Sequence, residues 1–255
     1  MLTTPSGLDR DIAAAVRADR LLVALDYDGT LAPFVQDPAA AVPDERAVSA
    51  VAALTNLPST TVAIVTGRDR EDLRAVAPVL TGGSTVIVDS HGANLAAPDP
   101  SAPTADRLVA ELSEVARRFA GTRVEAKAHG AALHTRGLSA HLSDAALAAA
   151  ETVGRSVRSG RVIRGNQVVE LTSSSATKGD ALTHLVDVLD PDAVVYIGDD
   201  TTDEDAFRAL IGRAGAVTIK VGHGPTCAQH RLTDVGEVAA LLGTLVVARE
   251  THAAS

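Results

Sequence analysis

The chain has 255 residues, of which 46% are hydrophobic, so it can bury a substantial core as one domain or two. Its formal net charge of −9 argues against a surface built to bind nucleic acid or an anionic membrane, because both need a basic field. Cys227 is the only cysteine, which excludes an internal disulfide and a multi-cysteine zinc site. No apolar run reaches the roughly 18 residues that span a bilayer, and the first residues do not resemble a secretory signal. We therefore expect a soluble, cytoplasmic protein.

Short aliphatic runs alternate with helical patterns along the chain. The runs that predict buried strands are residues 21–25, 61–65, 85–88, 193–197 and 216–221. Apolar residues recur at helical spacing over residues 47–57 and 69–80, between successive runs. Alternating strands and helices predict the α/β class, with a Rossmann-like parallel sheet and right-handed crossovers.

A segment of different texture interrupts this alternation. Residues 97–104 are rich in proline and small residues, which predicts a linker. Two coarse units follow, each a helix pattern that leads into a strand pattern: residues 105–120 into 123–136, and residues 143–159 into 161–172. We interpret residues 98–172 as a smaller inserted α/β domain, and residues 1–97 and 173–255 as the core.

Two carboxylates follow the first predicted strand, in the sequence Asp26-Tyr27-Asp28-Gly29-Thr30. Open α/β sheets bind ligands at the carboxyl ends of their strands. On a regular strand Asp26 and Asp28 would share a face, where one could attack a phosphoryl group while the other handles protons. A surface turn is the alternative, because Asp and Gly favour turns for local reasons. Clustered carboxylates repel each other unless a cation compensates them, and Mg²⁺ is the cation we expect.

Further polar groups follow the later predicted strands. Residues 199–205 begin directly after the fourth strand and include five acids, among which Asp199 is the predicted metal ligand. A solvated acidic turn is the alternative, and the later acids also suit a helix N-terminus. Thr66-Gly67-Arg68 follows the second strand and predicts a phosphate cradle at the start of a helix. Lys178 opens another helix, where it either neutralises a transferring phosphoryl group or is an ordinary surface lysine.

Taken in order, these motifs resemble the four motifs of the haloacid-dehalogenase-like phosphatases. The resemblance implies that Asp26 is the nucleophile, which forms an aspartyl-phosphate, and that Asp28 is the general acid. It implies that the phosphoryl group and its surroundings are bound by Thr66, Gly67, Arg68 and Lys178. It also implies a Mg²⁺ ion held by Asp26, the backbone carbonyl of Asp28 and Asp199, with Asp200 and Asp203 supporting that site from further out.

More specifically, the chain is similar to the trehalose-6-phosphate phosphatase family from about residue 20 to residue 243. The signals are Tyr27, Leu31, Ser90-His91-Gly92-Ala93, residues 124–127, Leu133-His134, Val169-Glu170, residues 196–207 and residues 219–222. This resemblance implies hydrolysis of trehalose 6-phosphate to trehalose and phosphate. It also implies that the inserted domain is a cap that holds the disaccharide, with the substrate-binding residues His91, Lys127, His134, Arg136 and Glu170.

The predicted strand at the start of the inserted domain has one charged face. Glu125, Lys127 and His129 alternate with small apolar residues, although an ordinary solvent-facing edge would give the same pattern. A bulge at Gly130 would reset the alternation and leave His134 and Arg136 on the site-facing side.

Three places depart from the family's pattern near the expected leaving-group pocket, namely Asn94, Thr135 and Thr172-Ser173. They leave a related glycosyl phosphate, such as a glucosylglycerol phosphate or a pseudo-disaccharide phosphate, as the alternative substrate. A catalytically silent binding subunit of a trehalose-phosphate synthase is a rival of another class, but it would be expected to have lost a reacting group. Functional association with such a synthase is a further implication of the resemblance.

Overall fold

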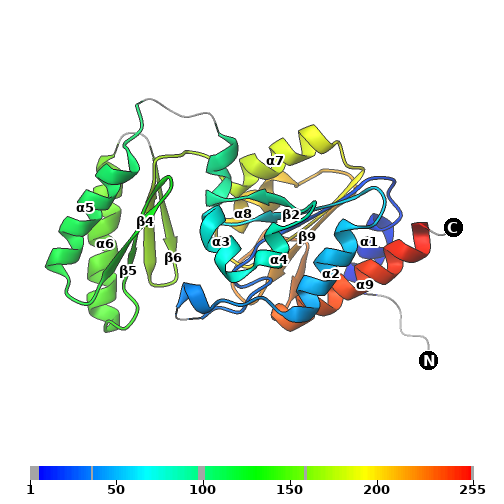
Figure 1. Cartoon of the computed structure of the whole chain (residues 1–255), viewed down its shortest axis with the longest axis horizontal. Coiled ribbons are helices and arrows are strands. Elements are labelled where there is room, and N and C mark those ends of the chain that lie inside the picture. Colours follow the sequence, from blue (N-terminus) through cyan, green and yellow to red (C-terminus); the bar gives the residue numbers. More distant parts are fainter. Residues whose placement is uncertain (1–5, 36, 97–100, 158–159, 254–255) are drawn as a thin grey trace. The chain divides into compact units, whose positions relative to one another are not determined.

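The structure is a computed structural model that describes residues 6–35, 37–96, 101–157 and 160–253 (Figure 1). The chain forms two compact units: the first runs up to Gly92 and resumes at Thr177, and the second comprises Ala93–Ala176. The sequence analysis placed the two boundaries at 97/98 and 172/173, and residues 97–100 of its predicted linker lie outside the described residues. Within the described ranges, no helix is long and apolar enough to cross a membrane.

A parallel sheet of six strands forms the centre of the first unit, in the order β10-β9-β8-β1-β2-β3. Its strands are β1 Leu21–Leu25, β2 Thr60–Val65, β3 Val86–Val88, β8 Ala193–Gly198, β9 Ala216–Val221 and β10 His230–Leu232. The α/β class and the parallel sheet are thus confirmed. Strand β10 was not predicted, because it has only three residues and no aliphatic run. Every residue of β1 is buried, since β1 pairs with β8 on one side and β2 on the other.

Helices cover both faces of this sheet, because alternate residues of a buried strand point to opposite sides (Figure 1). In β1, Leu21, Val23 and Leu25 belong to one apolar cluster, and Leu22 and Ala24 belong to another. The first cluster is closed by helices α1 Gly7–Ala15, α2 Glu45–Thr55, α3 Arg70–Val76, α4 Pro78–Thr81 and α9 Val235–Ala253. The second cluster is closed by helices α7 Lys178–Leu189 and α8 Asp203–Ala209. Burial of each Leu or Val side chain contributes about 1.5–3 kcal/mol, so both layers hold the sheet rigidly in place.

Two further features of the first unit differ from the expected pattern. The helix expected over residues 69–80 is interrupted at Ala77, because Pro78 disfavours helical geometry at the residue before it. Short 3₁₀ segments occur at η1 Pro38–Ala40 and η2 Ser90–Leu95, and the second contains left-handed residues at His91 and Gly92.

The second unit is an antiparallel sheet with two helices on one face. Its strands, in the order β4-β5-β7-β6, are β4 Arg123–Lys127, β5 Gly130–His134, β7 Val168–Thr172 and β6 Arg161–Gly165. Its helices are α5 Ala105–Arg118 and α6 Ala140–Ser156. Side chains from one face of the sheet, including Leu133 and Leu171, form an apolar cluster with Leu108, Leu112 and Leu147 of the helices.

Each strand predicted in this segment is a hairpin instead. Residues 123–136 form β4 and β5, and residues 161–172 form β6 and β7. The interpretation of Gly130 as a bulge is therefore wrong, because Gly130 begins β5 and pairs with Lys127 across the turn. A side chain at this position could not be accommodated, since its Cβ would lie 2.0 Å from the carbonyl oxygen of Leu171.

The last helix of the first unit is anchored by a buried arginine. The side chain of Arg249, which is 3% exposed, donates hydrogen bonds to the carbonyl oxygens of Val16, Ala18, Asp19 and Ser59 and to the hydroxyl of Thr60. These acceptors lie in the segments that lead into β1 and β2. One guanidinium therefore ties α9 to the amino ends of two neighbouring strands.

Arg249→Met is expected to destabilise the protein by about 3 kcal/mol, because it keeps the apolar stem but leaves several carbonyl groups without donors. Urea unfolding followed by circular dichroism measures this change. Arg208→Met is the matched control, because Arg208 forms an exposed ion pair with Asp205 and should contribute less than about 1 kcal/mol. Equal unfolding midpoints for the two variants would show that Arg249 is not an anchor.

Candidate active site

The carboxyl ends of neighbouring parallel strands bring two predicted acids together. Leu25 and Ile197 are partners in the pairing of β1 with β8, and the backbone N–H of Asp26 donates to the carbonyl of Ile197 at 2.9 Å. The loops that follow these strands touch at Gly29 and Asp199. A Cβ at Gly29 would lie 2.1 Å from Oδ2 of Asp199, and the φ of Gly29 is +78°. Glycine is therefore required at this position, both for space and for backbone conformation.

Lys178 is a buried cation rather than a surface lysine. Its Nζ lies 2.8 Å from Oδ1 of Asp26 and 2.8 Å from Oδ1 of Asp203, and its side chain is 2% exposed. Thr177 and Asp180 form a capping box that fixes the first turn of α7, and thereby the position of Lys178. Burial opposes the charge of the ammonium group, but Asp203 and Asp26 outweigh it and raise the pKa of Lys178. This lysine is therefore charged at neutral pH.

Asp203 is the hub of a hydrogen-bond network beneath the site. Its Oδ1 accepts from Lys178 and from the hydroxyl of Tyr196 at 2.8 Å, and its Oδ2 accepts from the backbone N–H groups of Asp199 and Asp200 at 3.0 and 2.9 Å. Asp203 is fully buried, so these four donors compensate its charge. The carboxylate holds the loop after β8 in a fixed shape. The site prediction omitted Tyr196, although a hydroxyl within an otherwise aliphatic strand was the available signal.

The carboxylates form a donor set that is compatible with a divalent metal ion. Ligand oxygens of Asp26, Asp199 and Asp203 all lie within 4.8 Å of one another. Burial, reinforced by Asp203, raises the pKa of Asp199 to about 7 and also raises the pKa of Asp26, although Lys178 opposes both shifts. Oδ1 of Asp199 is buried and lacks a hydrogen-bond partner. Because the oxygens of Asp203 already accept four hydrogen bonds, Asp26 and Asp199 are the residues that would hold a cation.

The loop after β2 is bound to the loop after β3. Thr66 donates its N–H to Val88, and the N–H groups of Ser90 and His91 donate to the carbonyls of Arg68 and Thr66, each at 2.9 Å. Ser90 and His91 have left-handed φ values of 51° and 56°, and these hydrogen bonds hold them in that conformation. The His91 ring lies against Gly67, where a Cβ would be 2.3 Å from the ring. The structure thus brings the predicted residues Thr66, Gly67 and His91 together.

Arg68 and Asp28 are paired with each other. The Nε and Nη2 atoms of Arg68 lie 2.7 Å from the two carboxylate oxygens of Asp28, and Nη2 also donates to the carbonyl of Pro38 at 2.8 Å. The guanidinium lies over the Tyr27 ring, 5.2 Å from its centroid. Among the described residues, Asp28 is not part of the carboxylate cluster around Asp26. Two residues predicted to act separately, as general acid and substrate ligand, therefore contact each other directly.

The polar residues predicted in the second unit form one ion pair and one hydrogen bond on one face of its sheet. Nζ of Lys127 lies 2.6 Å from Oε2 of Glu170, and Nε2 of His134 lies 2.8 Å from Oε2 of Glu125. The hydrogen bond from His134 lowers the pKa of Glu125 to about 2, although burial acts in the opposite direction. Arg136 follows β5 in a turn and is half-buried.

The departures from the family pattern have local structural roles. Thr135 is fully buried, and its hydroxyl lies 2.6 Å from the hydroxyl of Ser143 on α6. The alternation along β5 explains this burial, because the residue after His134 points to the helical side of the sheet. The hydroxyls of Thr172 and Ser173 both donate to the carbonyl of His129, and Asn94 is exposed.

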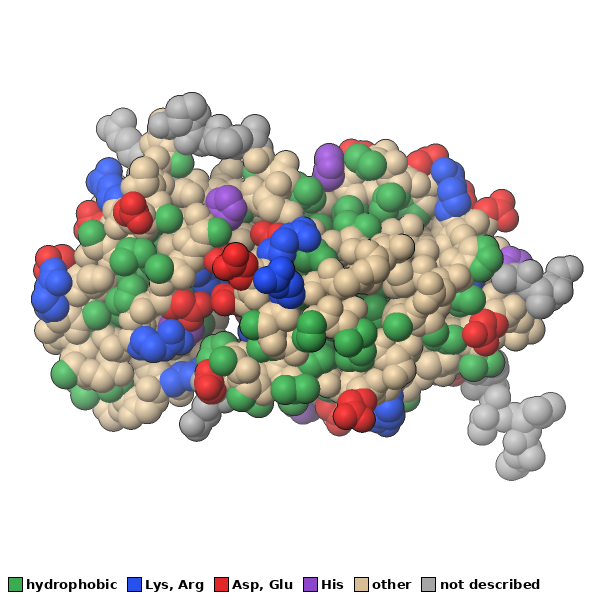
Figure 2. All heavy atoms as spheres, viewed as in Figure 1, with side chains coloured by type: hydrophobic (Ala, Val, Ile, Leu, Met, Phe, Trp, Pro, Cys, Tyr) green, Lys and Arg blue, Asp and Glu red, His purple; other side chains and the backbone are tan. Residues whose placement is uncertain are grey.

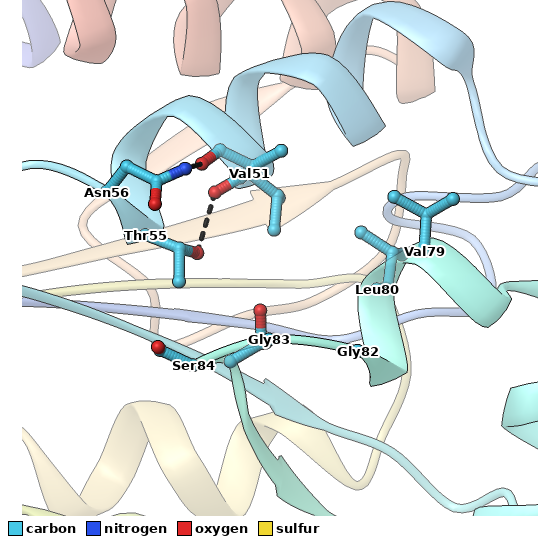
Figure 3. Close-up of a pocket in the computed structure, with 10 residues that line it drawn as sticks. Val51, Thr55, Asn56, Val79, Leu80, Gly82, Gly83 and Ser84 are labelled. Carbon is cyan, nitrogen blue, oxygen red and sulfur yellow. Dashed lines mark hydrogen bonds between the residues drawn. The ribbon is translucent and has the colours of Figure 1, made fainter.

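A separate pocket of about 270 Å³ lies between α2 and α4 (Figure 3). Its lining includes no acidic or basic side chain and none of the predicted site residues. The side chains of Thr55 and Asn56 donate to carbonyls of their own helix at 2.7 and 2.8 Å. The lining residues precede β2 and β3, so this pocket lies at the amino ends of the strands.

Figure 2 shows acidic and basic side chains interspersed on the face in view, without a continuous basic field.

Comparison of the fold with solved structures defines the class. The chain shares the fold of haloacid-dehalogenase-like hydrolases. It is similar to the C-terminal domain of trehalose-6-phosphate phosphatase from C. albicans, with a TM-score of 0.80 and 22% identity over 96% of this chain and 98% of that chain.

The sequence defines the family within this class. The chain belongs to the trehalose-phosphatase family, whose sequence model matches residues 24–235. It is 35% identical over 242 residues to a bifunctional trehalose-6-phosphate synthase/phosphatase from Thermoproteus tenax, covering 90% of this chain and 32% of the relative. It is 32% identical over 248 residues to a trehalose-phosphate phosphatase from Mycobacterium ulcerans, covering 89% of this chain and 61% of the relative. The chain thus spans less than two thirds of these curated relatives. The family resemblance stated from the sequence is confirmed.

Proposed function

We propose that this chain is a phosphatase that hydrolyses trehalose 6-phosphate to trehalose and phosphate through a phosphorylated Asp26. The observation that carries the proposal is the buried Lys178, which bridges Asp26, directly after β1, and Asp203, at the start of α8, in a member of the trehalose-phosphatase family. Lys178 can neutralise the charge of a phosphoryl group that is being transferred to Asp26. This suits phosphoryl transfer, because catalysis of that reaction comes mostly from positioning and charge neutralisation.

The side chains support a reaction in two steps. An oxygen of Asp26 attacks phosphorus while the bond from phosphorus to the sugar oxygen breaks, and Asp28, protonated for this step on a lone pair that Arg68 does not occupy, gives that proton to the sugar oxygen. Water then attacks the phosphorus of the aspartyl-phosphate, and Asp28 takes up a proton, which regenerates Asp26 and releases phosphate. Lys178 stabilises the negative charge throughout, and the hydroxyl of Thr66 is the proposed phosphoryl donor. Asp203, supported by Tyr196, keeps Lys178 aimed at Asp26.

Phosphate release from a panel of sugar phosphates tests the function. Trehalose 6-phosphate is expected to exceed glucose 6-phosphate by at least about tenfold in kcat/KM, because only the disaccharide carries a second sugar whose hydroxyl groups can be bound. Glucosylglycerol phosphate and a pseudo-disaccharide phosphate complete the panel as the alternative substrates. Preference for one of these would replace the substrate but keep the chemistry, whereas no release from any ester would refute the proposal.

Mg²⁺ is the proposed metal, with Asp26, the backbone carbonyl of Asp28 and Asp199 as ligands. When bound, the ion would neutralise the clustered carboxylates and the phosphoryl oxygens. Excess EDTA is therefore expected to abolish phosphate release, and added Mg²⁺ is expected to restore it, whereas Ca²⁺ should substitute poorly because its coordination is longer and looser. EDTA already saturated with Mg²⁺ is the control. Undiminished activity in excess EDTA would contradict a metal site.

The polar sheet face of the second unit is the proposed sugar-binding surface of a cap. Lys127→Ala, His134→Ala and Glu170→Ala are expected to lower kcat/KM for trehalose 6-phosphate about tenfold to a hundredfold each, because a hydrogen bond to a charged group contributes about 1.5–3 kcal/mol. Hydrolysis of p-nitrophenyl phosphate, which lacks the sugar, should change far less.

Arg164→Ala is the matched control in this unit, because Arg164 pairs with Glu151 of α6 instead of belonging to that polar face. This variant should leave both substrates unaffected. Equal losses on the sugar and aryl esters in the three test variants would mean that these residues support the fold instead.

We also propose that the phosphatase associates functionally with a trehalose-phosphate synthase. The Thermoproteus tenax relative, whose name combines the two activities, supports this association. Co-purification with the synthase from the same cells tests it, and a synthase that is never retained under mild conditions would count against it.

A further inference from the structure

Arg68 and Asp28 form a bidentate contact. Two parallel N–H···O bonds of 2.7 Å join the guanidinium to both oxygens of the carboxylate. This fork geometry restricts the carboxylate in position and in rotation, which a single hydrogen bond does not do. The orientation of the Asp28 side chain is therefore set by Arg68.

Arg68 is the fixed member of the pair. Its residue is 9% exposed, its N–H donates to the hydroxyl of Thr66 at 3.1 Å, and its carbonyl accepts from Ser90. The Pro38 carbonyl and the Tyr27 ring hold its guanidinium from two further directions. The side chain of Asp28, by contrast, is 36% exposed and lies in a turn just before Gly29. In the described part of the chain, both oxygens of Asp28 are held by this guanidinium, so the rotamer of Asp28 depends on Arg68.

These contacts also argue against a direct role of Arg68 in holding the phosphoryl group. Its Nε and Nη2 atoms are engaged by Asp28 and Pro38, whereas Lys178 already supplies a buried cation to Asp26. A guanidinium that left Asp28 to bind phosphate would give up two short charge-assisted bonds and leave the carboxylate unsupported.

We propose that Arg68 is a positioning residue, which orients the carboxylate of Asp28 toward the oxygen of the leaving group. The inference rests on the proposed function and adds to it a residue that acts through the general acid. It predicts a particular pattern of defects: Arg68 should matter when the leaving group needs a proton, and it should not matter when the leaving group departs unaided.

Two esters of different leaving-group basicity separate these cases. The sugar alkoxide of trehalose 6-phosphate needs protonation, whereas p-nitrophenolate does not. Because kcat/KM reports the steps up to release of the alcohol, it isolates the protonation step from the later hydrolysis of the aspartyl-phosphate. Arg68→Lys keeps the positive charge and loses the fork, so it is expected to lower kcat/KM for the sugar ester about 10–100-fold and for the aryl ester less than about threefold.

A double-mutant cycle with Asp28→Asn shows whether Arg68 acts through Asp28. If it does, Arg68→Lys in the Asp28→Asn background should lower kcat/KM for the sugar ester less than about twofold further. Arg70→Lys is the matched control, because Arg70 also binds a carboxylate and a carbonyl, but these belong to Asp89 and Ile87 instead of Asp28 and Pro38. This control should leave both esters unaffected.

Two kinetic outcomes would overturn the proposal. In the first, Arg68→Lys lowers kcat/KM equally for both esters. In the second, the double variant loses kcat/KM for the sugar ester by the product of the two single losses. Either would make Arg68 a ligand of the phosphoryl group or a purely structural residue. Arg68→Gln, compared by thermal unfolding, is the second variant if Arg68→Lys does not fold, and failure of both to fold would also overturn the positioning role. If the wild-type protein hydrolyses the aryl ester but not trehalose 6-phosphate, the proposed substrate fails, and the same comparison can be made with the sugar ester that it does hydrolyse.

Discussion

Asp26→Asn is expected to abolish turnover, with kcat lowered on the order of 10⁴–10⁶-fold, as for the loss of other covalent nucleophiles. The amide keeps the shape of the carboxylate but cannot attack phosphorus. Phosphate release measures the loss, and mass spectrometry of acid-quenched enzyme tests whether a phosphoryl group is still attached. Asp205→Asn makes the same chemical change at a half-buried position of α8, where Asp205 pairs with Arg208, and should remain active. Substantial turnover by folded Asp26→Asn would remove Asp26 from the nucleophile's role.

The same variant should not be less stable than the wild-type protein in the absence of a metal. Burial, together with the neighbouring Asp203, raises the pKa of Asp26, so its ionised form is disfavoured in the folded state at neutral pH, although Lys178 partly compensates. A neutral amide relieves this repulsion and can still accept a hydrogen bond from Lys178. Such separation of stability from activity is expected of a residue that is retained for its chemistry.

Lys178→Met is the variant with the largest combined effect. It is expected to destabilise the protein by about 3–5 kcal/mol, because Asp26 and Asp203 would remain buried without their shared cation. Activity should fall by more than about 10³-fold, since the transferring phosphoryl group also loses its buried positive partner. Chemical denaturation and phosphate release measure the two effects.

The double variant Lys178→Met with Asp26→Asn provides the internal control for this charge argument. Removal of one carboxylate reduces the uncompensated charge, so the double variant should regain part of the lost stability while remaining inactive. If Lys178→Met were as stable as the wild-type protein, the charge of Lys178 could not be what compensates the two acids.

The sequence predicts the core sheet well because its strands are unbroken aliphatic runs between loops. The runs at β1 and β9 match the observed bounds, and β8 differs by one residue. In the second unit the same reasoning joined each hairpin into one strand. The alternation of apolar and polar residues continues across Ala128 and His129, and the turn before β7 contains Gln167, a residue with positive φ that carries no turn signal of its own.

The convergence of the site residues was predictable, whereas their partners were not. Chain order and parallel pairing are enough to place Asp26, Thr66 and Asp199 at one edge of the sheet. They do not reveal where a long side chain from a neighbouring loop reaches. For that reason the sequence did not indicate that Arg68 contacts Asp28, or that Tyr196 supports Asp203.

Because Ala93–Ala176 is inserted between β3 and α7, the second unit is synthesised before the last part of the first unit. The second unit is one continuous stretch, so all of its strands and helices emerge before the first unit is complete. β1 emerges early but acquires its neighbour β8 only after that stretch has been synthesised. Until then, one edge of β1, the strand that leads into Asp26, is open, and the nascent chain exposes an aliphatic edge of the kind that promotes misassembly and chaperone binding.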